Sequence, residues 1–192
     1  LGYLGGRIAQ SLLTTNKYKV ILGTRGNQAG LSRKLAGCDI VLMNLLEKNS
    51  IQKILKGVDI IIHLAAMNAN ECAENPSNAL LVNALGTLNL IQSAKNSNVK
   101  RIIYFSTAHV YGSHLSGDIS EESLPKPNSH YAITHHVAEN YIIKLGEESD
   151  ISTTVVRLSN AIGSPASKDS NCWTLVANDI ARQIVETNKV SL

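Results

Sequence analysis

The chain of 192 residues is poor in aromatic side chains and in cysteine, with one Phe, one Trp and three Cys. Its lysines and arginines are scattered rather than clustered, and the net charge is only +3. A surface for nucleic acids normally combines basic clusters with aromatic residues, so this partner class is disfavoured. No apolar stretch reaches the ~20 residues that span a bilayer, and no signal-peptide pattern is present. We therefore expect a cytoplasmic protein without nucleic-acid or membrane partners.

The cysteines, Cys38, Cys72 and Cys172, are odd in number and widely spaced. Zinc sites need paired ligands at short spacing, and none of the three has a Cys or His partner arranged in that way. The sequence therefore predicts reduced thiols and no metal site.

Short apolar, β-prone runs alternate with segments of helical periodicity along the chain. Since 44% of the residues are hydrophobic, a sizeable core can form. Such alternation is typical of parallel β-α-β units and predicts an α/β fold, a Rossmann-like doubly wound parallel sheet. The predicted strands are 19–22, 39–42, 59–64, 101–105 and 153–157, and the predicted helices are 5–14, 50–56, 76–95, 130–145 and 174–187.

A hydroxyl, a phenol and an imidazole are predicted to meet at the end of one strand. A buried run leads into Ser106 and Thr107, and open α/β sheets bind their ligands at the carboxyl ends of strands. Tyr131, His135 and Glu139 follow at helical spacing and share one face. In this hypothesis Tyr131 acts as acid or base beside a nicotinamide, and a protonated His135 lowers its pKa. The alternative is a half-buried aromatic with solvated histidines, and hydroxyls that only satisfy backbone groups.

The start of the chain indicates a phosphate site. Gly2 and Gly5 precede an apolar-periodic helix whose first amides can hold a pyrophosphate, assisted by the helix dipole. After the next strand, Arg25 stands where an NAD-binding unit usually offers a carboxylate, and a guanidinium suits a 2′-phosphate. This favours NADP as cofactor, with NAD as the alternative. A glycine pair that only caps a helix and an exposed Arg25 remain open.

Several motifs together, by their order and spacing, resemble a known family. They are Gly2-Tyr-Leu-Gly5, Val58-Asp-Ile-Ile-Ile-His-Leu-Ala-Ala66, Asn83-Ala-Leu-Gly-Thr-Leu-Asn89, Ser106-Thr-Ala-His-Val-Tyr-Gly112, Tyr131-Ala-Ile-Thr-His135 and Val156-Arg-Leu-Ser-Asn160. With them the chain resembles an extended short-chain dehydrogenase/reductase of the NAD-dependent epimerase/dehydratase family, which modifies nucleotide-linked sugars.

The resemblance implies a role for each matching position and a nucleotide-sugar as substrate, and it leaves a homodimer open. Beside Arg25, the implied cofactor contacts are Gly2, Tyr3, Leu4, Gly5, Asn44, Leu45, Leu64, Ala65, Ala66, Tyr131 and His135. The catalytic positions are Thr107, Tyr131 and His135. Thr107 also faces the substrate, together with Asn160 and Asn178.

The chain departs from the family pattern at the catalytic helix and after the catalytic strand. His135 stands in place of a lysine that binds the nicotinamide ribose and lowers the pKa of the tyrosine. A histidine is only partly charged at neutral pH, so these duties become pH-dependent. Ala108 and His109 replace the acidic pair typical of 4,6-dehydratases. Dehydration therefore ranks behind epimerisation and keto reduction.

The ends of the chain also depart from the family. A strand before the glycine turn is absent, and the chain stops where the family continues. We therefore expect a fragment, with an NAD(P)-binding domain over 1–160 that lacks its first strand, and with 161–192 as the start of a substrate region lacking most of its C-terminal part.

The predicted function is an NAD(P)-dependent oxidoreductase or epimerase, with hydride transfer at a sugar carbon. Two alternatives stay open. One is a non-catalytic NADP-binding sensor or scaffold protein, and the other is a reductase of a non-sugar carbonyl compound.

Overall fold

A computed structural model describes residues 2–26, 35–113, 115–167, 170 and 172–191. The chain divides into two compact units, one made of Leu1–Leu42 with Asn160–Leu192 and the other of Met43–Ser159. Each unit is described by itself below. The predicted division into domains 1–160 and 161–192 stays a prediction.

The first unit joins the beginning of the chain to its end. Its elements are α1 (Tyr3–Thr14), β1 (Ile21–Thr24), β2 (Asp39–Leu42) and α7 (Val176–Thr187). The two strands pair in parallel, with Ile21 opposite Asp39. Their apolar side chains pack with the inner face of α1 in a small core that contains Ala9, Val20, Leu22 and Leu35.

The second unit is a three-stranded parallel sheet with helices. Its elements are α2 (Lys48–Ile54), β3 (Ile60–His63), α3 (Ala69–Glu74), α4 (Pro76–Ala79), the π-helix η2 (Leu80–Leu85), α5 (Gly86–Lys95), β4 (Arg101–Thr107), the 3₁₀ helix η3 (Ala108–Tyr111), α6 (His130–Glu148) and β5 (Ser152–Leu158). The strand order is β3-β4-β5, with Ile60 opposite Arg101 and Arg101 opposite Ser152.

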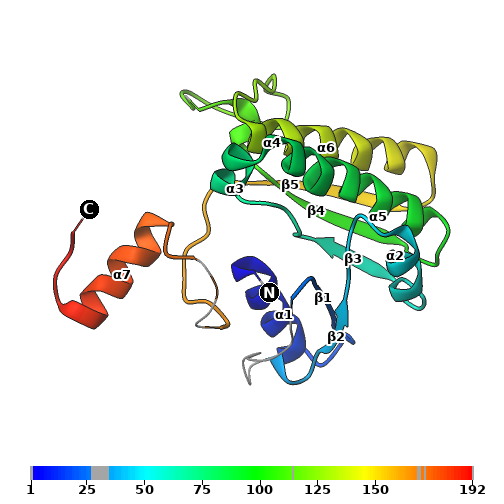
Figure 1. The fold of residues 1–192 in the computed structure, drawn as a ribbon, viewed down its shortest axis with the longest axis horizontal. Helices are drawn as coiled ribbons and strands as arrows, with labels where there is room; N and C mark the ends of the chain where they lie inside the picture. Colours follow the sequence, from blue (N-terminus) through cyan, green and yellow to red (C-terminus); the bar gives the residue numbers. More distant parts are fainter. Residues whose placement is uncertain (1, 27–34, 114, 168–169, 171, 192) are drawn as a thin grey trace. The chain divides into compact units, whose positions relative to one another are not determined.

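The core of the second unit lies between this sheet and its helices. Ile102 and Tyr104 alternate with less buried neighbours along β4, as a strand that faces a helical layer requires. The helices α5 and α6 lie side by side along the sheet (Figure 1) and supply the other half of the core. Fully buried aliphatic side chains of this kind each contribute roughly 1.5–3 kcal/mol to folding. The remaining members include Leu45, Ile51, Leu90, Ile91, Ala138, Ile142 and Leu145.

The predicted α/β fold with parallel strands is confirmed, and some element bounds differ. The strand predicted over 39–42 forms as predicted. The strand predicted at 19–22 is wrong by two residues, because its pairing with β2 begins at Ile21. The helix predicted over 76–95 contains the π segment η2, and α3 was not predicted. Asn68 and Glu71 form a capping box that starts α3, so a signal for this helix was present in the sequence.

The three cysteines are free thiols, and two of them, Cys72 and Cys172, are buried. Over the part of the chain that the structure describes, no helix combines the length and apolar character needed to cross a bilayer.

Candidate active site

Thr107 is the last residue of β4 and is buried. Its hydroxyl oxygen accepts a hydrogen bond from the backbone N–H of His109 at 3.2 Å, which caps η3. The same side chain lies close enough to the Tyr131 phenol to lower the pKa of that phenol. The Thr107 hydroxyl therefore satisfies a backbone group in the turn, as the alternative interpretation predicts. It also lies near Tyr131, as the active-site hypothesis predicts.

Tyr131 lies in the first turn of α6. Ser129 caps this helix by accepting a hydrogen bond from the N–H of Ala132 at 3.2 Å, which sets the start of the helix beside the end of β4. The rings of Tyr131 and His135 meet edge to face, with centroids 4.5 Å apart. The structure thus brings Thr107, Tyr131 and His135 together at one strand end, while their catalytic roles stay predictions.

His135 is buried and electrically neutral at neutral pH. Its Nδ1 lies 2.8 Å from the hydroxyl of Tyr104 on β4, and burial lowers its pKa to about 4 although Glu139 acts in the opposite direction. Two buried side-chain polar atoms have no partner within the described residues, His135 Nε2 and Ser106 Oγ.

The prediction that a protonated His135 lowers the pKa of Tyr131 is therefore wrong. Burial raises the pKa of the Tyr131 phenol, and the hydrogen bond with Thr107 offsets this only in part. The helical spacing correctly indicates that His135 faces Tyr131. It does not indicate how deeply both side chains lie in the protein, and desolvation decides their charge.

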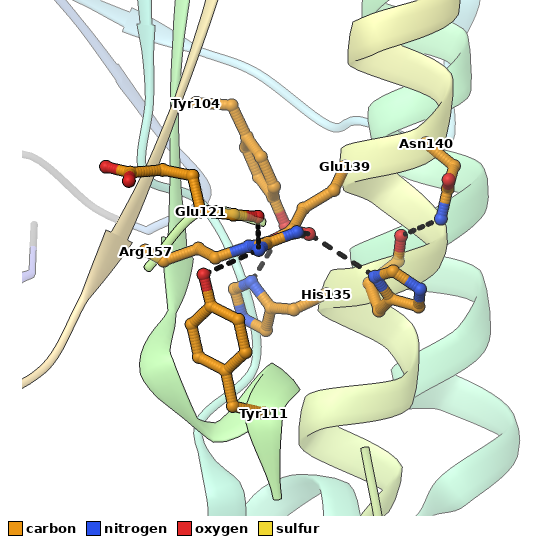
Figure 2. A network of polar contacts seen from close by, with 8 residues as sticks. Tyr104, Tyr111, Glu121, His135, Glu139, Asn140 and Arg157 are labelled. Carbon is orange, nitrogen blue, oxygen red and sulfur yellow. Dashed lines mark hydrogen bonds and ion pairs between the residues drawn. The ribbon is translucent and has the colours of Figure 1, made fainter. Parts of the chain in front are cut away.

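Glu139 does not present its carboxylate to the site as the helical spacing predicts. It is fully buried and accepts three hydrogen bonds from Arg157 of β5, from Nε to Oε1 at 3.1 Å, from Nε to Oε2 at 3.2 Å and from Nη2 to Oε2 at 2.9 Å. Arg157 Nη1 also donates to the hydroxyl of Tyr111 at 2.7 Å and to the carbonyl of Glu121 at 3.5 Å (Figure 2). The carboxylate therefore ties together the elements that surround His135.

Asn83 in the π segment η2 organises the other side of the site. Its side-chain oxygen accepts a hydrogen bond from the N–H of Met67 at 2.7 Å, and its amide nitrogen donates to the hydroxyl of Thr134 on α6 at 3.1 Å. These bonds hold the segment after β3 against α6. π segments are frequent at functional sites, but period-3.6 analysis of a sequence does not reveal them.

The predicted cofactor contacts of the second unit have different environments. Leu64, Ala65 and Ala66 follow the carboxyl end of β3, and Ala65 is exposed. Asn44 is exposed and its side chain accepts a hydrogen bond from the N–H of Leu46 at 3.0 Å. The side chain of Leu45 is buried in the core, so this residue offers only its backbone to a ligand.

The first unit offers a helix start that fits a phosphate. Gly2 is exposed at the N-cap of α1, which has no side-chain cap and no acidic residue in its first turn. A Cβ built at Gly2 meets no described atom within 4 Å, so there is room for a ligand. Tyr3 is buried and donates to the carbonyl of Gly163 at 2.9 Å, while Leu4 and Gly5 are half-buried. Arg25 is exposed directly after β1.

The two asparagines predicted to contact substrate differ in environment. Asn160 is exposed shortly after β5. Asn178 is buried, and its side chain accepts from the N–H of Gly163 at 2.9 Å and donates to the carbonyl of Cys172 at 3.4 Å. Both polar ends of Asn178 therefore hold the backbone of this loop. Substrate contact by either residue stays a prediction.

A protein-family model described as the NAD dependent epimerase/dehydratase family matches residues 1–191. Among curated proteins, the chain is 29% identical over 167 residues to a putative UDP-glucose 4-epimerase from Methanocaldococcus jannaschii, covering 84% of this chain and 54% of that protein. It is 33% identical over 156 residues to the GDP-6-deoxy-D-mannose reductase of Pseudomonas aeruginosa, covering 78% of this chain and 51% of that protein. The chain thus spans about half the length of these relatives.

Solved structures show the same fold. A dTDP-glucose 4,6-dehydratase from Streptomyces venezuelae, with NAD bound, matches with a TM-score of 0.80 and 24% identity, covering 96% of this chain and 59% of that one. A UDP-glucuronic acid 4-epimerase from Bacillus cereus in complex with NAD matches with a TM-score of 0.78 and 22% identity, covering 96% of this chain and 60% of that one.

Proposed function

We propose, because the chain belongs to the NAD dependent epimerase/dehydratase family, that the whole protein is an NAD(P)-dependent oxidoreductase or epimerase of a nucleotide-sugar. The observation that carries this proposal is the meeting of Thr107, Tyr131 and His135 at the carboxyl end of β4. The relatives act, by their names, on UDP- and GDP-linked sugars, which supports a substrate of this class.

In the proposed reaction, the nicotinamide cofactor supplies a hydride to a sugar carbonyl carbon or accepts one from the corresponding alcohol. Tyr131 gives its phenolic proton to the carbonyl oxygen in the reductive direction and takes the hydroxyl proton in the oxidative direction. Thr107 holds the same oxygen by a hydrogen bond, which keeps it within reach of the phenol. The Thr107 hydroxyl lies near enough to the Tyr131 phenol to act on its pKa, so one substrate oxygen could bridge the two groups.

Keto reduction is the first candidate for the direction of the reaction. Since His135 is neutral and the pKa of Tyr131 is raised, the phenol keeps its proton at neutral pH. A protonated phenol is ready to act as a general acid, whereas oxidation needs the phenolate. Epimerisation requires both directions in turn and is the second candidate.

A panel of substrates tests the proposed function. With NADPH or NADH present, we expect the full-length protein to reduce or epimerise nucleotide-linked sugars and to leave small ketones unchanged, as product analysis by chromatography and mass spectrometry would record. Turnover of small ketones alone would instead support the reductase of non-sugar carbonyl compounds.

NADP preference depends on Arg25, which is exposed at the end of β1. Changing Arg25→Asp removes the cation and adds a charge that repels a 2′-phosphate, so NADPH affinity should fall about 10- to 100-fold while NADH affinity holds or rises. Calorimetric titration of both variants with both cofactors measures this. The matched control is Arg101→Asp, because Arg101 is an exposed arginine at the amino end of β4, the opposite end of the strand from Thr107. Stronger binding of NADH than NADPH by the unchanged protein would contradict the assignment.

Homodimer formation and a cytoplasmic location stay predictions.

A further inference from the structure

We propose that Tyr104 is a positioning residue that fixes His135 as its Nε2–H tautomer, so that His135 serves the cofactor ribose as a neutral hydrogen-bond donor. The ribose part of this inference rests on the proposed function. The tautomer part rests only on the geometry of the second unit.

Tyr104 and His135 are in direct contact. The phenol oxygen lies 2.8 Å from Nδ1, both side chains are buried, and their rings are nearly parallel with centroids 5.9 Å apart. Burial raises the pKa of Tyr104 well above its usual value, so the phenol keeps its proton. The hydroxyl can therefore donate to a lone pair on Nδ1.

The two neutral tautomers of His135 leave different numbers of buried polar groups without a partner. If Nδ1 accepts from Tyr104, the hydroxyl proton is satisfied and only the Nε2–H lacks a partner. If Nδ1–H donates instead, Nε2 becomes a buried lone pair without a donor. The Tyr104 proton then also lacks an acceptor within the described part of the chain. Each buried polar group without a partner costs about 1–3 kcal/mol, so the Nε2–H tautomer is favoured.

The titratable groups that act on the imidazole come from three elements. From α6 these are Tyr131 and Glu139, from β4 Tyr104, and from β3 His63, whose pKa is lowered to about 4 by burial and by His135. The Glu139 carboxylate, the only anion of this set, is already paired with Arg157. The imidazole is therefore surrounded by groups that leave it neutral.

His63 lies on the other side of the Tyr104 ring, with the ring centroids 5.3 Å apart. Its Nε2 lies 2.9 Å from the hydroxyl of Thr87, and that hydroxyl donates its own proton to the carbonyl of Asn83 at 2.6 Å. The Thr87 oxygen must therefore accept, and His63 is an Nε2–H tautomer too. His63 thus has its own partner and leaves the Tyr104 proton to His135.

The Nε2–H of His135, which has no partner among the described residues, is the donor that a ligand would accept from. Tyr131, the proposed acid, stands edge to face with the same ring, so the donor lies beside the reacting group. A ribose hydroxyl of the nicotinamide half would accept this hydrogen bond. A lysine ammonium would bring a full positive charge to this position, whereas the neutral His135 offers one oriented N–H donor.

The test uses the full-length protein with ¹⁵N-labelled histidine, in which two-bond ¹⁵N–¹H spectra distinguish the tautomers. We expect His135, identified by loss of its signals in His135→Gln, to be Nε2–H at neutral pH without cofactor. Tyr104→Phe, which keeps the ring and removes the hydroxyl, should replace the single tautomer by a mixture of the two neutral forms, because each then leaves one N–H and one lone pair without a partner, and should weaken NADPH binding by about 2- to 10-fold. Tyr141→Phe, which removes an exposed phenol on the same α6, should change neither.

An Nδ1–H or doubly protonated His135 in the unchanged protein overturns the proposal, and this spectrum decides it even if Tyr104→Phe does not fold. An unchanged tautomer in a folded Tyr104→Phe overturns the role of Tyr104. If the unchanged protein binds neither cofactor, the proposed function and the ribose contact fail together, while the spectrum still decides the tautomer separately.

Discussion

Tyr131→Phe should lower kcat by a factor of about 10²–10⁴, because the substitution removes the proposed proton donor. The ring itself packs against a small apolar cluster that includes Met67 and Cys72, and its edge meets His135, so a phenylalanine keeps these contacts. Folding and cofactor affinity should therefore change little. Steady-state rates with the substrate found in the panel, together with a direct titration with NADPH, measure the two effects separately.

The matched control is Tyr141→Phe, which removes an exposed phenol ten residues further along α6 and should leave kcat unchanged. A kcat for Tyr131→Phe within threefold of the unchanged protein would rule out Tyr131 as the acid. If the unchanged protein binds NADPH without any turnover, the non-catalytic sensor or scaffold gains support. In that case Tyr131→Phe should leave partner binding intact.

Arg157→Met should lower the free energy of unfolding by about 3–5 kcal/mol, because it leaves the buried Glu139 carboxylate without its arginine and with only the 3.3 Å contact to His136 Nδ1 among the described residues. The side chain of Glu139 is 1% exposed and that of Arg157 is 18% exposed, so water cannot replace the lost partner at the carboxylate. This is a large fraction of the ~5–15 kcal/mol by which domains are usually stable. Urea denaturation followed by circular dichroism gives the value, provided that the slope with urea is the same for both proteins.

Two further variants show whether the buried charge is the cause. Changing Glu139→Gln in the Arg157→Met protein removes the unpaired charge and should recover part of the loss. Lys100→Met breaks an ion pair with Asp59 whose side chains are 78% and 69% exposed, and it should cost less than about 1 kcal/mol. A loss in Arg157→Met as small as that in Lys100→Met would contradict the role of this ion pair.

The pattern of apolar runs predicts most of the second unit, because the physical rule behind it is simple. A buried parallel strand must be apolar and β-branched, and β4 with Ile102 and Ile103 fits this description. The π segment η2 could not be predicted in this way, since its side chains follow a period other than 3.6. The bounds of β1 depend on where it pairs with β2, and the sequence of one strand alone does not show this.

The sequence also predicts only part of the candidate active site. The spacing of Tyr131 and His135 and the hydroxyl at the end of a strand predict that three side chains meet, and they do. Tyr104 was only a buried strand residue in the sequence, and nothing local indicates that its hydroxyl faces His135 across 31 positions. The charge of His135 was predicted wrongly for the same reason, because burial is a property of the assembled layers.

Arg157 has a consequence for the order in which the chain folds. It lies on β5, the last strand of its unit, yet its partners Glu139, Tyr111 and Glu121 precede it by 18, 46 and 36 residues. During synthesis these partners leave the ribosome first, and Glu139 must stay in water until its cation arrives, because burying it alone is costly. Contacts of such long sequence separation also form slowly. The side chains around His135 are therefore expected to pack last, in one step with the docking of β5.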